Sequence, residues 1–301
     1  MNPHRLKAYL LLLIVTIIWG VAEPIIKHTL GGFPPLLFLT YRFGLSTLAA
    51  VIFFAFLGFH FPKERKTQLE LLLYGFLNST VSLGLLFFGL NKTTVLDATL
   101  ITLINPLLIA FAGVYFLKEH VTSREKTGMA IALVGTLLTV AEPFWQNGHT
   151  LTRFSGNILI FIYLFTTAWG AVLAKKLLRA EVSPLTMTNF SFVIGFLTLV
   201  PFAALKYQIS TILDVPLPYH LGVIFMALIS GSLAYFLANK AQKTIEIGEA
   251  AVFSYLYPIF AAPLAVIWLG EVITPIYLLG AVISTLGVVI AETKKNLNVK
   301  S

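Results

Sequence analysis

Two stretches of equal length set the frame for the whole chain: DATLITLINPLLIAFAGVYFLKE at residues 97–119 and EAAVFSYLYPIFAAPLAVIWLGE at residues 249–271. Each is an almost unbroken apolar run with a proline near its middle and a glutamate at its end. Matching positions are 152 residues apart, both for Pro106 and Pro258 and for Glu119 and Glu271. About 20 apolar residues suffice for a helix to cross a bilayer. The two stretches therefore predict two related membrane spans.

The composition extends this reading to the rest of the chain. Of its 301 residues 57% are apolar and 11% charged, and the mean hydropathy is +0.87, whereas soluble domains carry about 25% charged residues. Ten apolar runs lie at about 6–30, 34–58, 69–90, 95–117, 126–142, 156–177, 185–206, 219–239, 248–269 and 273–292. We predict an all-α integral membrane protein with ten transmembrane helices.

The basic residues predict how these helices are oriented. Cytoplasmic loops of membrane proteins carry an excess of Lys and Arg. With the N-terminus inside, 16 of the 21 Lys and Arg residues fall in cytoplasmic segments. The exceptions are Lys27, Lys92, Arg153 and Lys206 on the opposite side and Arg42 within a span. Both termini are therefore expected in the cytoplasm. Because no small-residue cleavage site follows the first run, we expect it to be a span and not a removed signal peptide.

Several landmarks recur in one register across the two halves. They are Trp19-Gly20 with Trp169-Gly170, Asn105-Pro106 with Tyr257-Pro258, and Gly128 and Gly135 with Gly280 and Gly287. A unit of five spans has an odd number, so its second copy must enter the membrane from the opposite side. We predict two inverted five-helix repeats, residues 1–147 and 148–301. Inverted repeats suit alternating access to one central site.

Two charged residues are expected well inside the membrane. Glu23 lies within the first run and Arg42 within the second, and charges at that depth are costly and usually functional. One could hold a substrate carboxylate or ammonium group while Glu23 also carries a coupling proton. Two structural alternatives remain open: a buried ion pair that fixes helix register, and an arginine that reaches outward to the interface.

Other polar or aromatic residues at mid-span are candidates for the substrate pathway. They are Trp19, Tyr41, Asn78, Asn105, Trp169, Asn189, Tyr235 and Tyr257. Each could instead serve packing, anchoring or a hydrogen bond between helices. Pro106 and Pro258 are candidate hinges, because proline removes a helical hydrogen bond and kinks the chain. The small-residue stripes in the fifth and tenth runs predict tight helix packing, within the scaffold or at an oligomer contact.

Motifs for catalysis are missing from the sequence. It has no cysteine, its six histidines lie in loops or at span ends, and it contains neither HExxH nor GxSxG nor a phosphate-binding glycine loop. We therefore expect no enzyme activity, no cofactor and no metal, and we expect transport to be driven by a gradient or by exchange. The basic residues form no face or stripe, so we expect no nucleic-acid partner.

Taken together, the quoted residues resemble the drug/metabolite transporter superfamily, in particular the EamA-type ten-helix transporters. The likeness covers essentially the whole chain. It implies secondary export of small metabolites through a central cavity lined by spans 1–4 and 6–9, with spans 5 and 10 peripheral. Glu23 departs from the family pattern, in which this position is usually uncharged. Arg42 has no charged counterpart, since Ser191 stands at that register, so we expect a site that is asymmetric in charge.

These observations predict an exporter of small metabolites such as amino acids, working by alternating access in a plasma (inner) membrane as a monomer or homodimer. Its partners would be a small-molecule substrate and membrane lipid. Two alternatives remain: a lipid flippase or scramblase on the same fold, and, less favoured, a membrane-embedded enzyme.

Overall fold

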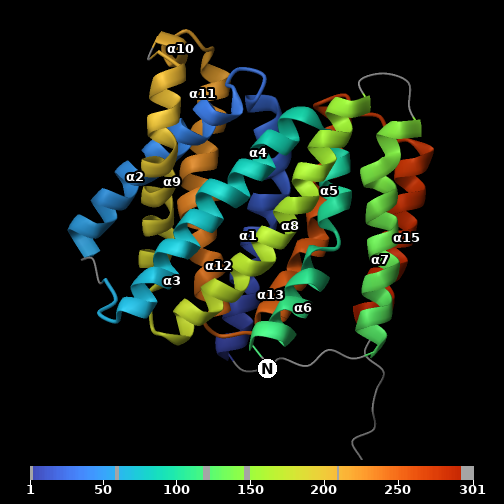
Figure 1. The fold of residues 1–301 in the computed structure, drawn as a ribbon, viewed down its shortest axis with the longest axis horizontal. Helices are drawn as coiled ribbons and strands as arrows, with labels where there is room; N and C mark the ends of the chain where they lie inside the picture. The colour runs from blue at the N-terminus through green and yellow to red at the C-terminus, as the bar shows by residue number, and fades with distance from the viewer. Residues whose placement is uncertain (1–2, 58–60, 118–122, 146–149, 209, 293–301) are drawn as a thin grey trace, which may run out of the picture.

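The chain forms a bundle of long helices in a computed structural model that describes residues 3–57, 61–117, 123–145, 150–208 and 210–292 (Figure 1). The uninterrupted long helices are α1 (Pro3–Thr29), α2 (Pro35–Leu57), α7 (Ser123–Ala141), α8 (Thr150–Arg179), α9 (Pro184–Lys206) and α15 (Pro275–Glu292). The predicted repeat boundary at residues 147 and 148, and the Lys118-Glu119 motif, lie outside the described residues.

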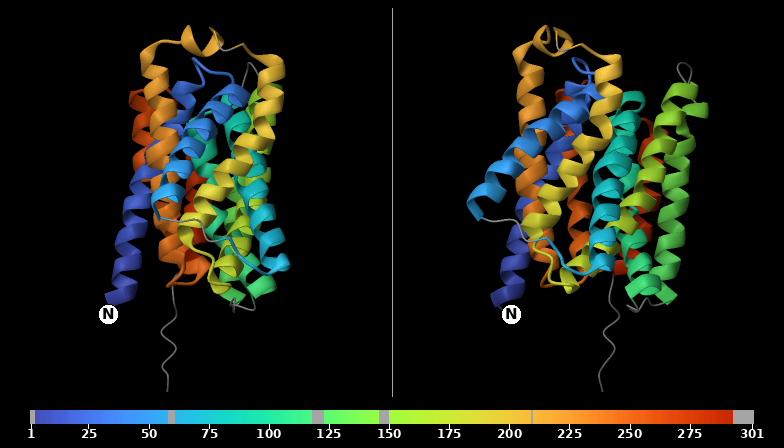
Figure 2. Two further views of the ribbon diagram at one scale, coloured as in Figure 1. Left: turned by 90° about the vertical axis from the view of Figure 1, so that its left-hand side faces the viewer. Right: turned by 60° about the vertical axis from the view of Figure 1, so that its left-hand side comes forward.

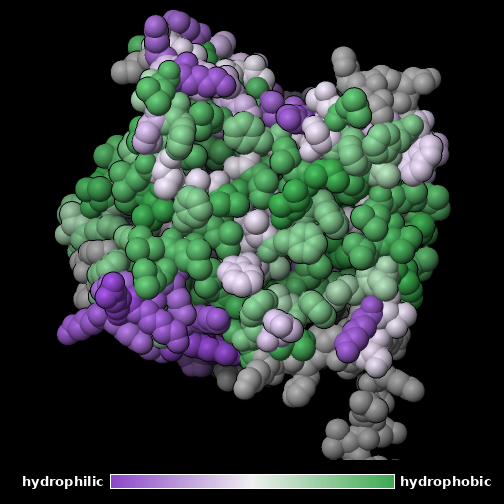
Figure 3. Space-filling view, viewed as in Figure 1, coloured by the Kyte–Doolittle hydropathy of each residue, from purple (hydrophilic) through white to green (hydrophobic). Residues whose placement is uncertain are grey.

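Nine helical stretches of the described chain are long and apolar enough to cross a membrane. They correspond to the first nine predicted spans, from His4–Thr29 to Ile247–Ile267. At the tenth predicted span the structure has the apolar helix α15, of which Pro275–Ile290 falls in the class of shorter apolar helices, so the count of ten spans stays a prediction. On the face shown in Figure 3, apolar side chains form a broad band across the middle, and hydrophilic residues gather toward its upper and lower ends.

Four spans are interrupted near their middle, and these interruptions come in matched pairs. The third span is built of α3 (Arg65–Gly75), the π-helix η1 (Phe76–Ser82) and α4 (Leu83–Lys92). The eighth is built of α11 (Leu217–Ile224), the π-helix η3 (Phe225–Leu233) and α12 (Ala234–Gln242). π-helical turns are rare and frequently mark functional sites.

The fourth and ninth spans are the second interrupted pair. The fourth consists of α5 (Val95–Thr102) and α6 (Asn105–Leu117), and the ninth of α13 (Ile247–Ala251), the 3₁₀ helix η4 (Val252–Leu256) and α14 (Tyr257–Ile267). In both spans the regular helix resumes at the residue before the proline, Asn105 before Pro106 and Tyr257 before Pro258. The role of these prolines as hinges stays a prediction. The remaining short helices are η2 (Glu142–Trp145) and α10 (Ser210–Leu213).

α7 and α15 pack against each other at one side of the bundle (Figures 1 and 2). A methyl group added to Gly287 would lie 2.3 Å from the Ala132 nitrogen, and one added to Gly135 would lie 2.4 Å from the Ser284 hydroxyl. Side chains larger than hydrogen would therefore hold the two backbones apart. The predicted small-residue stripes thus face each other within one chain and do not form an oligomer contact.

Matched polar contacts secure the two ends of the bundle. Lys27 Nζ donates to the carbonyls of Leu90 (2.7 Å) and Thr93 (2.5 Å) at one end. At the other end Lys175 Nζ donates to those of Gln242 (3.0 Å) and Ile245 (2.6 Å). Each lysine thus satisfies carbonyls at the C-terminus of an interrupted span, where a helix leaves them without partners.

The α7–α15 contact generates a prediction for stability. Gly287→Ala should lower the melting temperature of the detergent-solubilised protein, because overpacking of this kind costs roughly 1–3 kcal/mol and the obstructing atoms belong to the backbone. The matched control is Gly84→Ala, since an added methyl group there meets no atom within 4 Å. That variant should be as stable as the native protein or slightly more stable, by up to about 1 kcal/mol. Equal melting temperatures for the two variants would contradict this packing.

Candidate functional site

A cavity of about 200 Å³ lies in the centre of the bundle, and both halves of the chain contribute to its wall. Its lining comes from α1, α2, α8 and all four interrupted spans. It extends to Leu12, Gln242 and Ile247, which lie at the end of the bundle where α1 begins. At the opposite end, beyond Ile26 and Leu86, fully buried phenyl rings such as Phe33 and Phe87 fill the interior.

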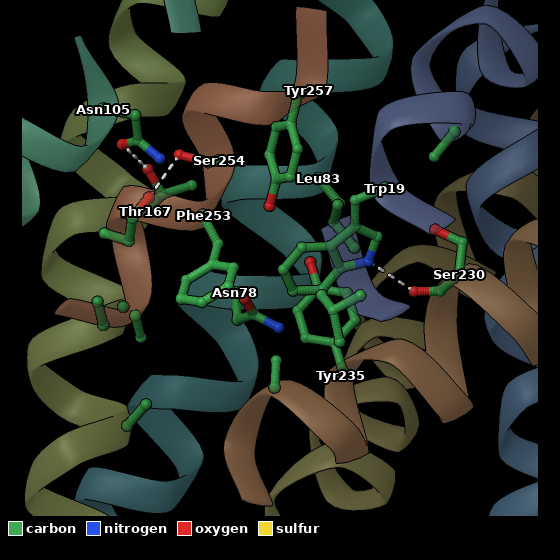
Figure 4. A pocket seen from close by; sticks show the side chains of 18 of the residues that line it. Trp19, Asn78, Leu83, Asn105, Thr167, Ser230, Tyr235, Phe253, Ser254 and Tyr257 are labelled. Atoms are coloured by element: carbon green, nitrogen blue, oxygen red, sulfur yellow. Dashed lines mark hydrogen bonds between the residues drawn. The ribbon is translucent and has the colours of Figure 1, made fainter. Parts of the chain in front are cut away.

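Trp19 forms one wall of the cavity. Its indole Nε1 donates to the carbonyl oxygen of Ser230 in η3, at 3.0 Å, and its ring stands edge-on to Tyr235 with the centroids 5.0 Å apart. On the facing wall the Thr167 hydroxyl donates to Asn105 Oδ1 at 2.9 Å. Tyr257 and Asn78 lie between these walls (Figure 4).

Two residues of the described lining, Glu23 and Arg42, carry a formal charge at neutral pH. The Arg42 side chain is 1% exposed, and its Nε and Nη1 atoms have no hydrogen-bond partner. Three phenyl rings surround its guanidinium carbon, with centroids 5.5–6.0 Å away: Phe43, Phe87 and Phe192. Aromatic faces stabilise a cation, but they do not satisfy its N–H groups.

Glu23 is placed differently. Its Oε2 atom accepts a hydrogen bond of 3.1 Å from the Thr99 hydroxyl. The Thr99 hydroxyl also lies 2.7 Å from the Val95 carbonyl, and a hydroxyl has one hydrogen to share between them. Within the described part of the chain neither Glu23 nor Arg42 forms an ion pair. The alternative of a direct Glu23–Arg42 ion pair is therefore wrong for this conformation.

The structure brings most of the predicted pathway residues together and leaves three outside. The cavity lining includes Trp19, Glu23, Arg42, Asn78, Asn105, Tyr235 and Tyr257. Tyr41 is turned away toward His220 Nδ1, 3.2 Å from its hydroxyl. Asn189 is buried outside the lining, and Trp169 is 45% exposed and packs on Phe116. Trp169 misses the cavity because Thr167, Gly170 and Ala174 occupy the face of α8 that lines it.

Sequence reasoning did not name six polar residues of the lining as site candidates: Thr16, Tyr74, Tyr163, Thr167, Asn239 and Gln242. Tyr163 and Thr167 stand in the middle of the sixth predicted span. A hydroxyl at mid-span was therefore the available signal for both of them. Tyr74 and Asn239 lie nearer the ends of their predicted spans, where a polar residue attracts less notice.

The first turns of α1 and α8 each form an ion pair with an interrupted span, one at each end of the bundle. Arg153 of α8 binds both carboxylate oxygens of Asp97, at 2.6 and 2.8 Å, and the Asp97 side chain is fully buried. Arg5 of α1 binds Glu249 at 2.7 Å in a more exposed pair. Near Asp97, Glu271 accepts the backbone N–H groups of Val95 and Leu96, and burial raises the pKa of its carboxyl.

The sequence profile of the EamA-like transporter family matches residues 6–141 and again residues 154–293. The chain belongs to the EamA-like transporter family. It is thus a multi-pass membrane transporter of the drug/metabolite transporter superfamily and not an enzyme. The two matches cover one interrupted pair of spans each, η1 with α5–α6 and η3 with α13–α14.

Relatives of this EamA-like transporter are found along nearly its whole length. An "Uncharacterized transporter YyaM" of Bacillus subtilis (strain 168) is 27% identical over 96% of this chain and 94% of its own. A "Probable amino-acid metabolite efflux pump" of Salmonella typhimurium is 26% identical over 93% of each chain. A solved structure titled "Crystal structure of protein" shares the fold with a TM-score of 0.67, at 15% identity over 95% of this chain and 96% of that one.

The buried Asp97–Arg153 pair generates a prediction. Asp97→Asn should destabilise the protein by about 3 kcal/mol, because it removes the buried carboxylate that binds Arg153 through two hydrogen bonds and leaves the longer pair with Glu142, at 3.5 Å. Glu181→Gln is the matched control, since Glu181 pairs with Lys243 at 2.8 Å in an exposed setting, where such pairs contribute about 0–1 kcal/mol. Thermal unfolding in detergent measures both variants. A loss for Asp97→Asn no greater than that for Glu181→Gln would contradict a stabilising role for this buried pair.

Proposed function

We propose that this EamA-like transporter is a secondary active exporter of small metabolites such as amino acids, which it moves by alternating access. The observation that carries the proposal is the central cavity, which reaches one end of the bundle and is filled by buried rings at the other. Its volume of about 200 Å³ lies below the roughly 300–1,000 Å³ of sites for drug-sized ligands. A small polar metabolite fits this space better than a lipid.

We further propose that the two halves are inverted repeats, and matched contacts support this. The contact of Gly287 with Gly128 and Ala132 becomes that of Gly135 with Gly280 and Ser284 when the halves are exchanged at an offset of 152 residues. The two lysine contacts correspond, and so do the ion pairs Arg153–Asp97 and Arg5–Glu249: the basic residues of α1 and α8 are 148 residues apart and their partners 152. Such pairing of equivalent positions is expected of halves related by a two-fold axis in the membrane plane.

The same alignment places the packing of α1 and α8 in register. A methyl group added to Gly20 would lie 2.8 Å from Phe260 Cβ, so α1 and α14 are tightly packed there. At the offset of 148 residues that aligns α8 with α1, the counterpart of Gly20 is Ala168, which is buried and packs against Ile109 and Ala112 of α6. The contact between α1 and α14 therefore has a counterpart between α8 and α6.

Membrane orientation assigns the open side. The end where α1 begins is the one for which basic residues predict a cytoplasmic location. In that orientation the structure is the inward-open state, ready to load substrate from the cytoplasm. Both termini would then lie in the cytoplasm of a cell whose plasma (inner) membrane holds the protein.

Energy for export would come from a proton gradient or from exchange of solutes. Glu23 is the proposed proton carrier, because it lines the cavity and is bound by one hydroxyl, that of Thr99. Thr99 binds it through the hydroxyl, and the tyrosines Tyr163 and Tyr257 line the same cavity. No basic side chain in the described lining sits within ion-pair distance of it.

Transport into proteoliposomes tests the proposed function. A mixed pool of radiolabelled amino acids and other metabolites should yield a few accumulated compounds, and an imposed pH gradient should stimulate their accumulation. Gradient-independent flux of the same compounds would indicate exchange. Translocation of labelled lipid without any flux of metabolites would contradict the proposal and favour a flippase or scramblase.

In the same assay Glu23→Gln should abolish the stimulation by the pH gradient while leaving substrate-driven exchange measurable. Glu70→Gln serves as the control, since Glu70 lies outside the cavity lining. Unaltered gradient dependence in Glu23→Gln would remove the proton-carrying role from this residue.

A further inference from the structure

We infer that Glu23 and Thr99 together form the proton site of this transporter, in which one hydroxyl serves both protonation states of the carboxyl group. Thr99 donates its hydrogen to Glu23 when the carboxylate is ionised, and it accepts a hydrogen from Glu23 when the carboxyl is protonated. The inference rests on the proposed role of Glu23 as proton carrier and adds Thr99 as a positioning residue. It is carried by the contacts of Thr99 and by the side chains at the equivalent place in the second half.

The Thr99 hydroxyl has two acceptors within reach. Its oxygen lies 3.1 Å from Glu23 Oε2 and 2.7 Å from the carbonyl oxygen of Val95, one turn earlier in α5. A hydroxyl carries one hydrogen and two lone pairs. When the hydrogen is directed to Glu23, it stabilises the ionised carboxylate. When the hydrogen is directed to Val95, the hydroxyl oxygen can accept the O–H of a protonated carboxyl. Both protonation states are therefore satisfied with the same positions of the heavy atoms.

Glu23 can exchange its proton through the cavity. Its side chain is half-buried and belongs to the cavity lining, whereas Thr99 is 1% exposed and lies outside the lining. Within the described residues the carboxylate forms no ion pair. An adjacent cation would favour the ionised form strongly. Because no salt bridge has to be broken here, the carboxylate can both take up and release a proton.

Other titratable groups lie on the elements around this pair, and none of them binds it in the described part of the chain. They are Lys27 of α1, Arg42 of α2, Tyr74 of α3, Asp97 of α5, Tyr163 of α8, Tyr235 of α12, Tyr257 of α14 and Glu271 beyond α14. Lys27 and Asp97 are bound to other groups, and Arg42 lies among its three phenyl rings. The hydroxyl that touches the carboxylate therefore acts on it most directly.

A buried polar network holds the start of α5 in place. The Asp97 carboxylate, two residues before Thr99, accepts hydrogen bonds from Arg153 at 2.6 and 2.8 Å and from Asn157 Nδ2 at 3.0 Å. The Asp97 side chain is fully buried. Since α5 has eight residues, a fixed first turn also fixes the direction in which the next turn presents its side chains. The network thus positions the Thr99 hydroxyl toward α1.

The second half of the chain indicates that packing does not require this polar pair. The ion pairs at the two ends align α8 with α1 at an offset of 148 residues and α13 with α5 at an offset of 152. At these offsets the counterparts of Glu23 and Thr99 are Ala171 and Ala251. Both alanines line the cavity and pack against one hydrophobic cluster. Alanine at both places is compatible with the fold, so we attribute the polar pair to function.

Infrared spectroscopy of the purified protein across a pH titration tests the pair directly. A protonated carboxyl has a C=O stretching band, and the loss of a band in Glu23→Gln identifies the one that belongs to Glu23. In Thr99→Val the carboxylate loses its hydrogen-bond donor, so this band should appear at a proton concentration about tenfold lower than in the native protein. Thr99→Ser retains the hydroxyl and should titrate as the native protein does.

Two further variants control for folding and for the substitution itself. Thr99→Ala should titrate like Thr99→Val, and it introduces the residue that stands at the equivalent place in the second half. Thr102→Val is the matched control on the same helix. The Thr102 hydroxyl donates to the Thr99 carbonyl at 3.0 Å and lies outside the cavity lining, so this variant should titrate at the native pH.

Transport supplies a second readout. In the proteoliposome assay the stimulation by a pH gradient should reach half of its maximum at a pH about one unit higher in Thr99→Val than in the native protein. Thr99→Ser should restore the native pH profile. A merely structural role of Thr99 would lower the transport rate without moving this profile.

Two outcomes would overturn the inference. Equal titration of Thr99→Val and Thr102→Val would mean that the Thr99 hydroxyl does not govern the proton affinity of Glu23. A Thr99→Ser variant that titrates like Thr99→Val would assign the effect to packing instead of the hydroxyl. The infrared titration requires no flux. The absence of metabolite flux would therefore reject the proposed export function, whereas an unshifted titration would reject the proton site alone.

Discussion

A positive charge held inside an apolar bundle without a counter-charge is the constraint on which this structure depends. Arg42 is 1% exposed, and its guanidinium rests among three phenyl rings with two nitrogens unpartnered. A protein optimised for stability alone would replace or neutralise such a group. Its retention is expected where function requires a charge inside the membrane, and Glu23, the other charged residue of the described cavity lining, likewise has no ion-pair partner.

Around this charged centre the same contacts recur in the two halves of the chain. The lysine contacts, the end ion pairs and the contact between α7 and α15 occur in matched positions. Contacts that recur in both halves can persist if the two halves exchange conformations. The interrupted spans line the cavity, and in the proposed mechanism they are the segments that would bend.

The positions of the helices could be predicted from sequence because apolar runs and their charged boundaries report directly on the membrane. Trp19, Arg42 and Tyr257 could also be predicted as site residues, because polar or aromatic side chains within an apolar span stand out in the sequence. The direction in which a side chain points could not be predicted: Trp169 repeats the motif of Trp19 but is 45% exposed on another face of its helix. The π-helices η1 and η3 and the Thr99 partner of Glu23 depend on packing between distant segments, and no local pattern encodes them.

The chain contains no cysteine, so a single one introduced on the cavity wall at Ala171 would report access directly. Labelling by a membrane-impermeant maleimide would be measured in right-side-out and inside-out vesicles, with and without saturating substrate on one side. Alternating access predicts rapid labelling from the cytoplasmic face in the resting state. It also predicts that any condition which raises labelling from one face lowers it from the other. Simultaneous labelling from both faces, unaffected by substrate, would mean a continuous pore and would contradict the account.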